Sequence, residues 1–160
     1  MVNIGFIGLG IMGKPMAGHL MEEGHALFLH SRSGVPDDLV VRGGRACATA
    51  KELAQQADVI ITMLPDTADV ECVLFGDNCI MEGLACHPDI SKIVIDMSSI
   101  SPLKTRDFAA RLKAQGHDYV DAPVSGGDVG AQNASLTIMV GAEVEVFEKV
   151  KPILELMGNS

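Results

Sequence analysis

The sequence contains no tryptophan, and aromatic residues make up only 4% of its 160 residues. It has no run of basic residues that could contact nucleic-acid phosphates, and its formal net charge is -9. No apolar stretch reaches the length of a membrane span. The N-terminus shows no charged segment followed by a small-residue cleavage site. These absences argue against a nucleic-acid partner, a membrane protein and a secreted protein, and favour a cytoplasmic location.

The four cysteines form no C-x-x-C pair; they are Cys47, Cys72, Cys79 and Cys86. Zinc sites usually draw on tighter pairs, so the even spacing of the last three does not predict a metal centre. We therefore expect no bound metal and four free thiols that are buried or half-buried.

Aliphatic residues dominate the 48% of the sequence that is hydrophobic, a composition that suits buried parallel strands covered by helices. Strand and helix patterns alternate. The expected strands are 2–7, 25–30, 45–48, 58–64, 92–97, 117–121 and 136–140, and the expected helices are 11–23, 36–43, 49–56, 65–76, 101–115 and 143–157. Thr49 and Ser101 are expected helix N-caps. Segment 77–91 is the least regular and is expected to contain a single short turn. Segment 122–134 is expected to be a glycine-rich loop that is too long for a simple connector.

This alternation predicts one α/β domain over residues 1–160. The expected fold is Rossmann-type and doubly wound, with a mainly parallel sheet covered by helices on both faces.

The first strand leads directly into Gly8-Leu9-Gly10-Ile11-Met12-Gly13, which matches G-x-G-x-x-G, and a helix follows. In this context Gly8 allows a tight turn, Gly10 lets the backbone approach a pyrophosphate, and Gly13 permits close helix packing. The helix N-terminus supplies the local positive field with which an acidic protein can bind an anion. We therefore assign all six residues to a dinucleotide site.

The second strand ends in Leu29-His30-Ser31-Arg32-Ser33, without the carboxylate that usually binds the 2′-hydroxyl of the NAD ribose. Arg32 can pair with a 2′-phosphate, and Ser31 and Ser33 can donate hydrogen bonds to it. The predicted cofactor is therefore NADP(H), with NAD(H) as the alternative.

Four segments together resemble the β-hydroxyacid dehydrogenases. They are the run from Gly5 to Gly13, Met63-Leu64-Pro65, Asp96-Met97-Ser98-Ser99 and Asp121-Ala122-Pro123-Val124-Ser125-Gly126-Gly127. This family includes 3-hydroxyisobutyrate dehydrogenase, tartronate semialdehyde reductase (2-hydroxy-3-oxopropionate reductase) and relatives of 6-phosphogluconate dehydrogenase. The sequence of residues 94–102 is most similar to that of the tartronate semialdehyde reductases.

The resemblance implies that Met63, Leu64 and Pro65 contact the cofactor and that Ser99 lies near the nicotinamide ribose. It also implies that Ser125-Gly126-Gly127 binds the substrate. A serine hydroxyl beside two glycines offers backbone N–H groups that can surround a carboxylate.

The resemblance further implies hydride transfer between NAD(P) and a small 3-hydroxy acid or its semialdehyde, in a full-length enzyme that is a homo-oligomer. In the family, a catalytic lysine and an all-helical second domain follow this region. None of the lysines here matches the lysine position, so the chain is expected to hold the cofactor and to carry no catalytic residue of its own. Two other functions stay open, namely a non-catalytic NADP(H)-sensing module and a 6-phosphogluconate dehydrogenase-like enzyme.

Overall fold

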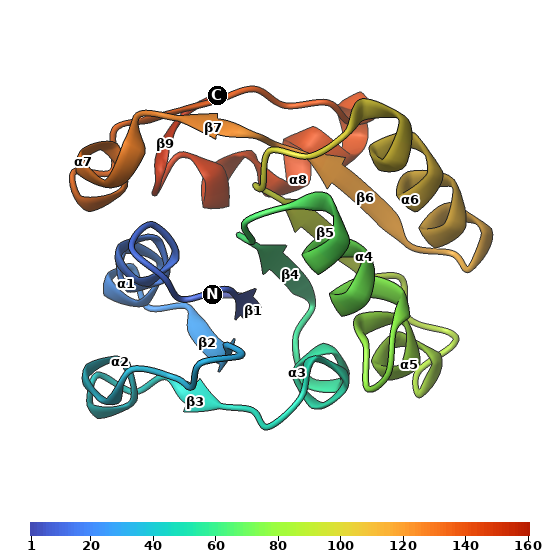
Figure 1. The fold of residues 1–160 in the computed structure, drawn as a ribbon, viewed down its shortest axis with the longest axis horizontal. Helices are drawn as coiled ribbons and strands as arrows, with labels where there is room; N and C mark the ends of the chain where they lie inside the picture. The colour runs from blue at the N-terminus through green and yellow to red at the C-terminus, as the bar shows by residue number, and fades with distance from the viewer.

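Six parallel strands form the main sheet of the computed structural model, which describes residues 1–160. Their order across the sheet is β3-β2-β1-β4-β5-β6 (Figure 1). The strands are β1 (Asn3–Ile7), β2 (Ala26–His30), β3 (Arg45–Ala46), β4 (Val59–Thr62), β5 (Ile93–Asp96) and β6 (Asp118–Asp121). The order reverses between β1 and β4, which is where such sheets place their ligands. The predicted fold class is confirmed.

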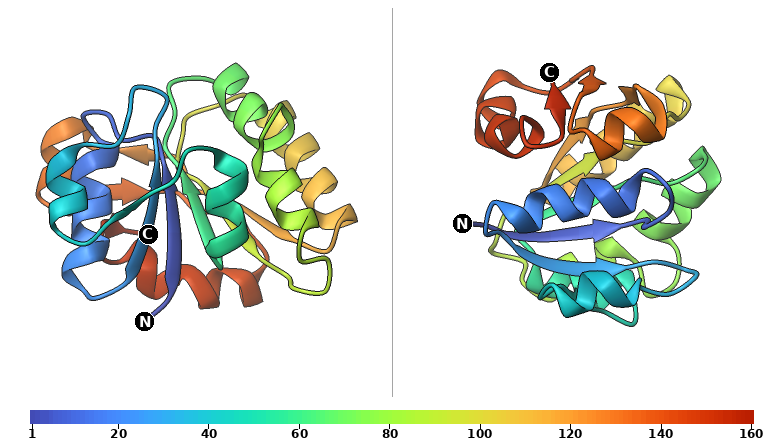
Figure 2. Two further views of the ribbon diagram at one scale, coloured as in Figure 1. Left: turned by 90° about the horizontal axis from the view of Figure 1, so that it is seen from below. Right: turned by 90° about the vertical axis from the view of Figure 1, so that its left-hand side faces the viewer.

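Helices cover both faces of this sheet (Figure 2). One face packs against α1 (Gly13–Glu22), α2 (Asp37–Val41), α7 (Gly127–Gln132) and α8 (Val144–Leu154). The other packs against α3 (Ala50–Gln56), α4 (Thr67–Phe75), α5 (Ile80–Ala85) and α6 (Pro102–Ala114). Within β4, Ile61 enters the first core and Ile60 the second. Because successive residues of β4 serve opposite cores, Val59, Ile60 and Ile61 form an uninterrupted apolar run.

The helix starts nearest the carboxyl ends of the strands follow local rules, with one exception. The Thr49 hydroxyl accepts a hydrogen bond from the Glu52 N–H, as predicted, and Asp66 caps α4 in the same way through the Asp69 N–H. Ser101 occupies the N-cap position of α6, followed by Pro102 as predicted, but its side chain makes no cap hydrogen bond. Its backbone N–H instead donates to the Thr67 hydroxyl at 3.1 Å, which ties the start of α6 to α4.

The glycine-rich segment 122–134 is not a simple loop. It contains β7 (Val124–Ser125) and α7, and β7 pairs antiparallel with β8 (Leu136–Ile138). Parallel to β8 lies β9 (Gly158–Asn159). The strand expected at 136–140 therefore belongs to a separate three-stranded sheet. α7 packs on α1, and after it β8 pairs with β7. Gly141 then forms a single antiparallel bridge to Asp121 at the end of β6.

A second correction concerns segment 77–91, which contains α5. The carboxylate of Glu82 accepts the Cys79 N–H at 3.0 Å and so fixes the first turn. Gly83 brings α5 against α3, since a Cβ at this position would collide with the Lys51 carbonyl. Glycine is a poor helix former in an isolated helix. Here the packing of α5 against α3 outweighs that low helix propensity.

None of these helices is both long and apolar enough to cross a lipid bilayer. All four cysteines are free: Cys47 and Cys79 are buried, whereas Cys72 and Cys86 are exposed and not half-buried as expected.

Candidate functional site

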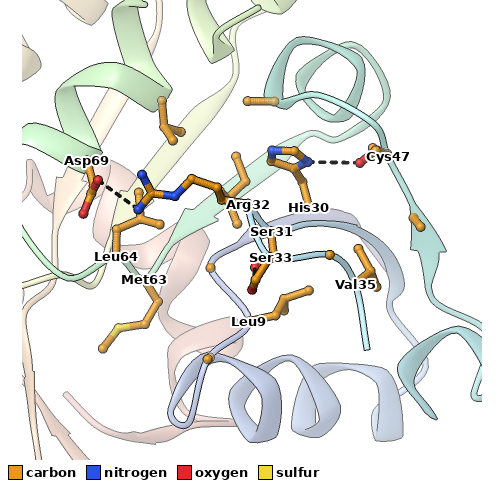
Figure 3. Close-up of a pocket in the computed structure, with 18 of the residues that line it drawn as sticks. Leu9, His30, Ser31, Arg32, Ser33, Val35, Cys47, Met63, Leu64 and Asp69 are labelled. Atoms are coloured by element: carbon orange, nitrogen blue, oxygen red, sulfur yellow. Dashed lines mark hydrogen bonds and ion pairs between the residues drawn. The ribbon is translucent and has the colours of Figure 1, made fainter. Parts of the chain in front are cut away.

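A groove of about 1390 Å³ lies at the carboxyl ends of β1, β2 and β4 (Figure 3). Three sequence segments far apart in the chain line it together: the glycine turn at 8–13, residues 30–35 after β2, and residues 63–65 after β4. The start of α4 contributes Asp69. This volume exceeds that of an ordinary small-ligand pocket, so the groove has room for a large ligand.

The glycine turn is closely packed on one side and open on the other. Gly8 has a φ of +102°, and a Cβ there would collide with the Met63 carbonyl. A Cβ on Gly13 would collide with the Gly8 carbonyl, so both glycines are required by the turn itself. Gly10 differs, because a Cβ there would meet no atom within 4 Å. The absence of a side chain at Gly10 therefore leaves space in the groove, and the packing of the turn does not require a glycine there.

A run of backbone N–H groups in this turn has no partner in the protein. The first N–H beyond the turn to bond is that of Lys14, which donates to the Gly10 carbonyl at 3.0 Å. The preceding N–H groups donate to no protein atom and belong to groove-lining residues, namely Leu9, Gly10, Ile11, Met12 and Gly13. The first turn of α1 contains no acidic residue. Free donors at a helix N-terminus form a site for an anion such as a diphosphate.

At the end of β2 the predicted polar residues do line the groove. The hydroxyl oxygens of Ser31 and Ser33 lie 3.4 Å apart. The side chain of Arg32 is 85% exposed, and its Nη2 lies 3.3 Å from Oδ1 of Asp69 on α4. Figure 3 shows the Arg32 side chain extending from the β2 end toward α4. One cationic and two hydroxyl groups are thus available to a ligand at this end.

The loop after β4 is held by a buried carboxylate on the next strand. Asp96 is fully buried and accepts hydrogen bonds from the Thr62 hydroxyl at 2.9 Å, the Tyr119 hydroxyl at 2.9 Å and the Ser98 N–H at 3.1 Å. The Ser98 hydroxyl then accepts the Leu64 N–H at 2.8 Å. Burial raises the pKa of the Asp96 carboxyl, and the three donors partly oppose that shift. This network positions Leu64 at the groove.

Two of the predicted segments lie outside the groove lining. Ser99 is exposed just beyond buried Ser98, and neither lines the groove. Ser125, Gly126 and Gly127 are also exposed, at the junction of β7 and α7. The structure therefore brings together the glycine turn, residues 31–33 and residues 63–65, and leaves the other two predicted segments apart from them.

Sequence reasoning missed Asp69 and Asp96. Asp69 occupies the first turn of α4, where an acidic residue is read as a helix-start signal, and its contact with Arg32 spans 37 positions in the chain. Asp96 was noticed only as part of a motif. Its position at the last residue of a buried strand was the available signal, because a buried carboxylate needs hydrogen-bond partners.

The sequence matches, over residues 3–160, the family described as the NAD binding domain of 6-phosphogluconate dehydrogenase. Among relatives, 2-hydroxy-3-oxopropionate reductase of Escherichia coli (strain K12) is 46% identical over 160 residues, which are 99% of this chain and 53% of that protein. Mycobacterium tuberculosis 3-hydroxyisobutyrate dehydrogenase, solved with L-serine, superposes with a TM-score of 0.86 at 34% identity over 100% of this chain and 53% of that one.

The solved structure titled Psf3 in complex with NADP+ and 2-OPP superposes with a TM-score of 0.88 at 28% identity, covering 98% of this chain and 55% of that one. This chain therefore spans about half the length of the relatives it matches. The resemblance drawn from four short motifs is confirmed over the whole chain.

Proposed function

This chain belongs to the family of NAD-binding domains of 6-phosphogluconate dehydrogenase, and on that premise we propose that it holds the dinucleotide of an oxidoreductase. The proposed enzyme transfers a hydride between NADP(H) and a small 3-hydroxy acid or its semialdehyde. The names of a 2-hydroxy-3-oxopropionate reductase and a 3-hydroxyisobutyrate dehydrogenase among the relatives support this substrate class. A cytoplasmic, homo-oligomeric enzyme is part of the same proposal.

The observation that carries the proposal is the run of free N–H groups from Leu9 to Gly13. Five adjacent residues that line one groove have N–H groups without a protein partner, which suits the oxygens of a diphosphate. The α1 N-terminus adds a favourable field. A chain with a formal net charge of -9 thus acquires a local anion site. In the bound state we expect the diphosphate above Gly10, where no side chain interferes.

The preference for NADP(H) rests on the groove end beside β2. Arg32 is exposed there and carries free guanidinium donors, and Ser31 and Ser33 add two hydroxyl groups. A guanidinium matches the geometry of a phosphate better than that of a ribose hydroxyl. Residues 30–35 supply no carboxylate to repel a 2′-phosphate.

For the substrate we propose the segment Ser125-Gly126-Gly127. It is exposed, and Gly127 has no neighbour within 4 Å of its Cβ position, so a carboxylate can approach the backbone. No lysine lines the cofactor groove, and the proposal assigns the chain cofactor and substrate binding without an acid–base residue.

Titration of the chain with NADPH and NADH, followed by the fluorescence of the reduced cofactor, tests the cofactor proposal. The chain has no tryptophan that would add its own emission. Arg32→Ala is expected to weaken NADPH binding about tenfold and to leave NADH binding nearly unchanged, because only NADPH offers the charged partner. Arg106→Ala, on exposed α6 outside the groove, is the matched control. Equal affinities that Arg32→Ala does not change would remove the NADP(H) assignment.

A further inference from the structure

A carboxylate does reach the groove end beside β2, although the β2 end itself supplies none. It comes from Asp69 in the first turn of α4, whose Oδ1 lies 3.3 Å from Nη2 of Arg32. The Asp69 side chain is 23% exposed and lines the groove. Figure 3 shows the two side chains meeting over the pocket. An acidic and a basic group therefore share the place proposed for the cofactor's adenosine ribose.

The cap of α4 does not explain the direction in which the Asp69 side chain points. Its backbone N–H donates to the Asp66 carboxylate at 2.9 Å, and that bond does not involve the Asp69 side chain. The helix dipole favours an acidic residue in the first turn of a helix. It does so for every side-chain rotamer that keeps the carboxylate near that turn. The contact with Arg32 is thus an additional feature.

We propose, on the basis of the function proposed above, that Asp69 is a cofactor-selectivity residue that weakens binding of NADP(H) relative to NAD(H). A 2′-phosphate that binds Arg32 must draw the guanidinium from Asp69 or approach while the carboxylate stays beside it. Both routes disfavour a phosphate, since like charges in proximity repel. The neutral 2′-hydroxyl of NAD(H) meets no such penalty and can donate a hydrogen bond to the carboxylate.

The ion pair is weak enough for a ligand to break. The guanidinium is 85% exposed and makes a single contact with the carboxylate. Exposed pairs of this kind contribute little free energy. Asp69 therefore reduces the preference for NADP(H) without preventing its binding.

Calorimetric titration of the wild-type chain and Asp69→Asn with NADP+ and NAD+ tests this proposal. The asparagine keeps the shape of the side chain and leaves the cap from Asp66 intact. We expect Asp69→Asn to bind NADP+ about three- to tenfold more tightly and NAD+ equally or more weakly. A gain of affinity for one cofactor only is not the result of a general loss of structure.

Glu71→Gln is the matched control, because it removes the same charge from the same helix. Its carboxylate lies 3.6 Å from Lys104 and does not line the groove. The control is expected to leave the ratio of the two dissociation constants unchanged.

Five results would overturn the proposal. An equal gain for both cofactors, or the same gain in Glu71→Gln, would indicate a general effect of net charge. Weaker NADP+ binding in Asp69→Asn would show that Asp69 orients Arg32 for the phosphate. Binding of neither cofactor by the wild-type chain would reject the proposed function together with this inference, whereas an Arg32-dependent preference that Asp69→Asn leaves unchanged would reject this inference alone.

Discussion

Replacing Gly10 with alanine should separate cofactor binding from folding. A Cβ at this position meets no atom within 4 Å, and Gly10 is not among the glycines with positive φ. The substitution therefore introduces no strain, and alanine restricts the unfolded chain more than glycine does. We expect the free energy of unfolding to stay unchanged or to rise by up to about 1 kcal/mol.

The same methyl group should strongly impair binding. It would stand where the diphosphate is expected to approach the free N–H groups of the turn. Loss of two of these charge-assisted hydrogen bonds, at about 1.5 kcal/mol each, amounts to about 3 kcal/mol. This loss corresponds to a dissociation constant about a hundredfold higher.

Gly8→Ala provides the contrasting variant. Its φ of +102° and the nearby Met63 carbonyl make a side chain costly there. We expect its stability to fall by about 2 kcal/mol or more, from backbone strain and steric overlap. Urea unfolding and calorimetric titration of both variants measure the two effects. If Gly10→Ala bound NADPH within about twofold of the wild-type affinity, the diphosphate would not lie above this turn and the reasoning would fail.

Two further predictions concern the residues behind the groove. Ser98→Ala removes the acceptor of the Leu64 N–H, so we expect a loss of about 1–3 kcal/mol in urea unfolding together with weaker cofactor binding; unchanged affinity would show that Leu64 needs no such support. Burial, with a further contribution from Asp96, raises the pKa of Asp121 above its ordinary value of 3.8. The protonated carboxyl is thus the form that favours folding, and its contribution is lost as pH rises through the folded-state pKa. Asp121→Asn should therefore be more stable than wild type at neutral pH, and this gain should shrink on acidification; a gain that does not vary with pH would contradict the assignment.

Local rules were sufficient for the elements that build the main sheet and the glycine turn. The central strand β4 is short and buried on both faces, and Thr49 caps α3 as its position predicts. The free N–H groups of the turn follow from a glycine pattern between a strand and a helix. These features depend on residues near one another in the chain, so the sequence alone could predict them.

Other features depend on contacts that the sequence does not display. The helix α7 buries only Gly130 and Ala131, so its apolar periodicity is too weak to indicate a helix. Its place is set by packing on α1 and by the contact of Gly130 with Leu136. The meeting of Arg32 with Asp69 likewise requires the fold to bring β2 and α4 to the same groove.

The hydrogen bonds around Asp96 have a mechanical consequence for the groove. They join three adjacent strands, from Thr62 and Asp96 at the ends of β4 and β5 to Tyr119 within β6. The loop after β4 is therefore braced by hydrogen bonds to two further strands, whereas Arg32 and Ser33 on the other side of the groove have exposed side chains. Residues that select the nucleotide can thus be exchanged after β2 without disturbing the hydrogen bonds that position Leu64.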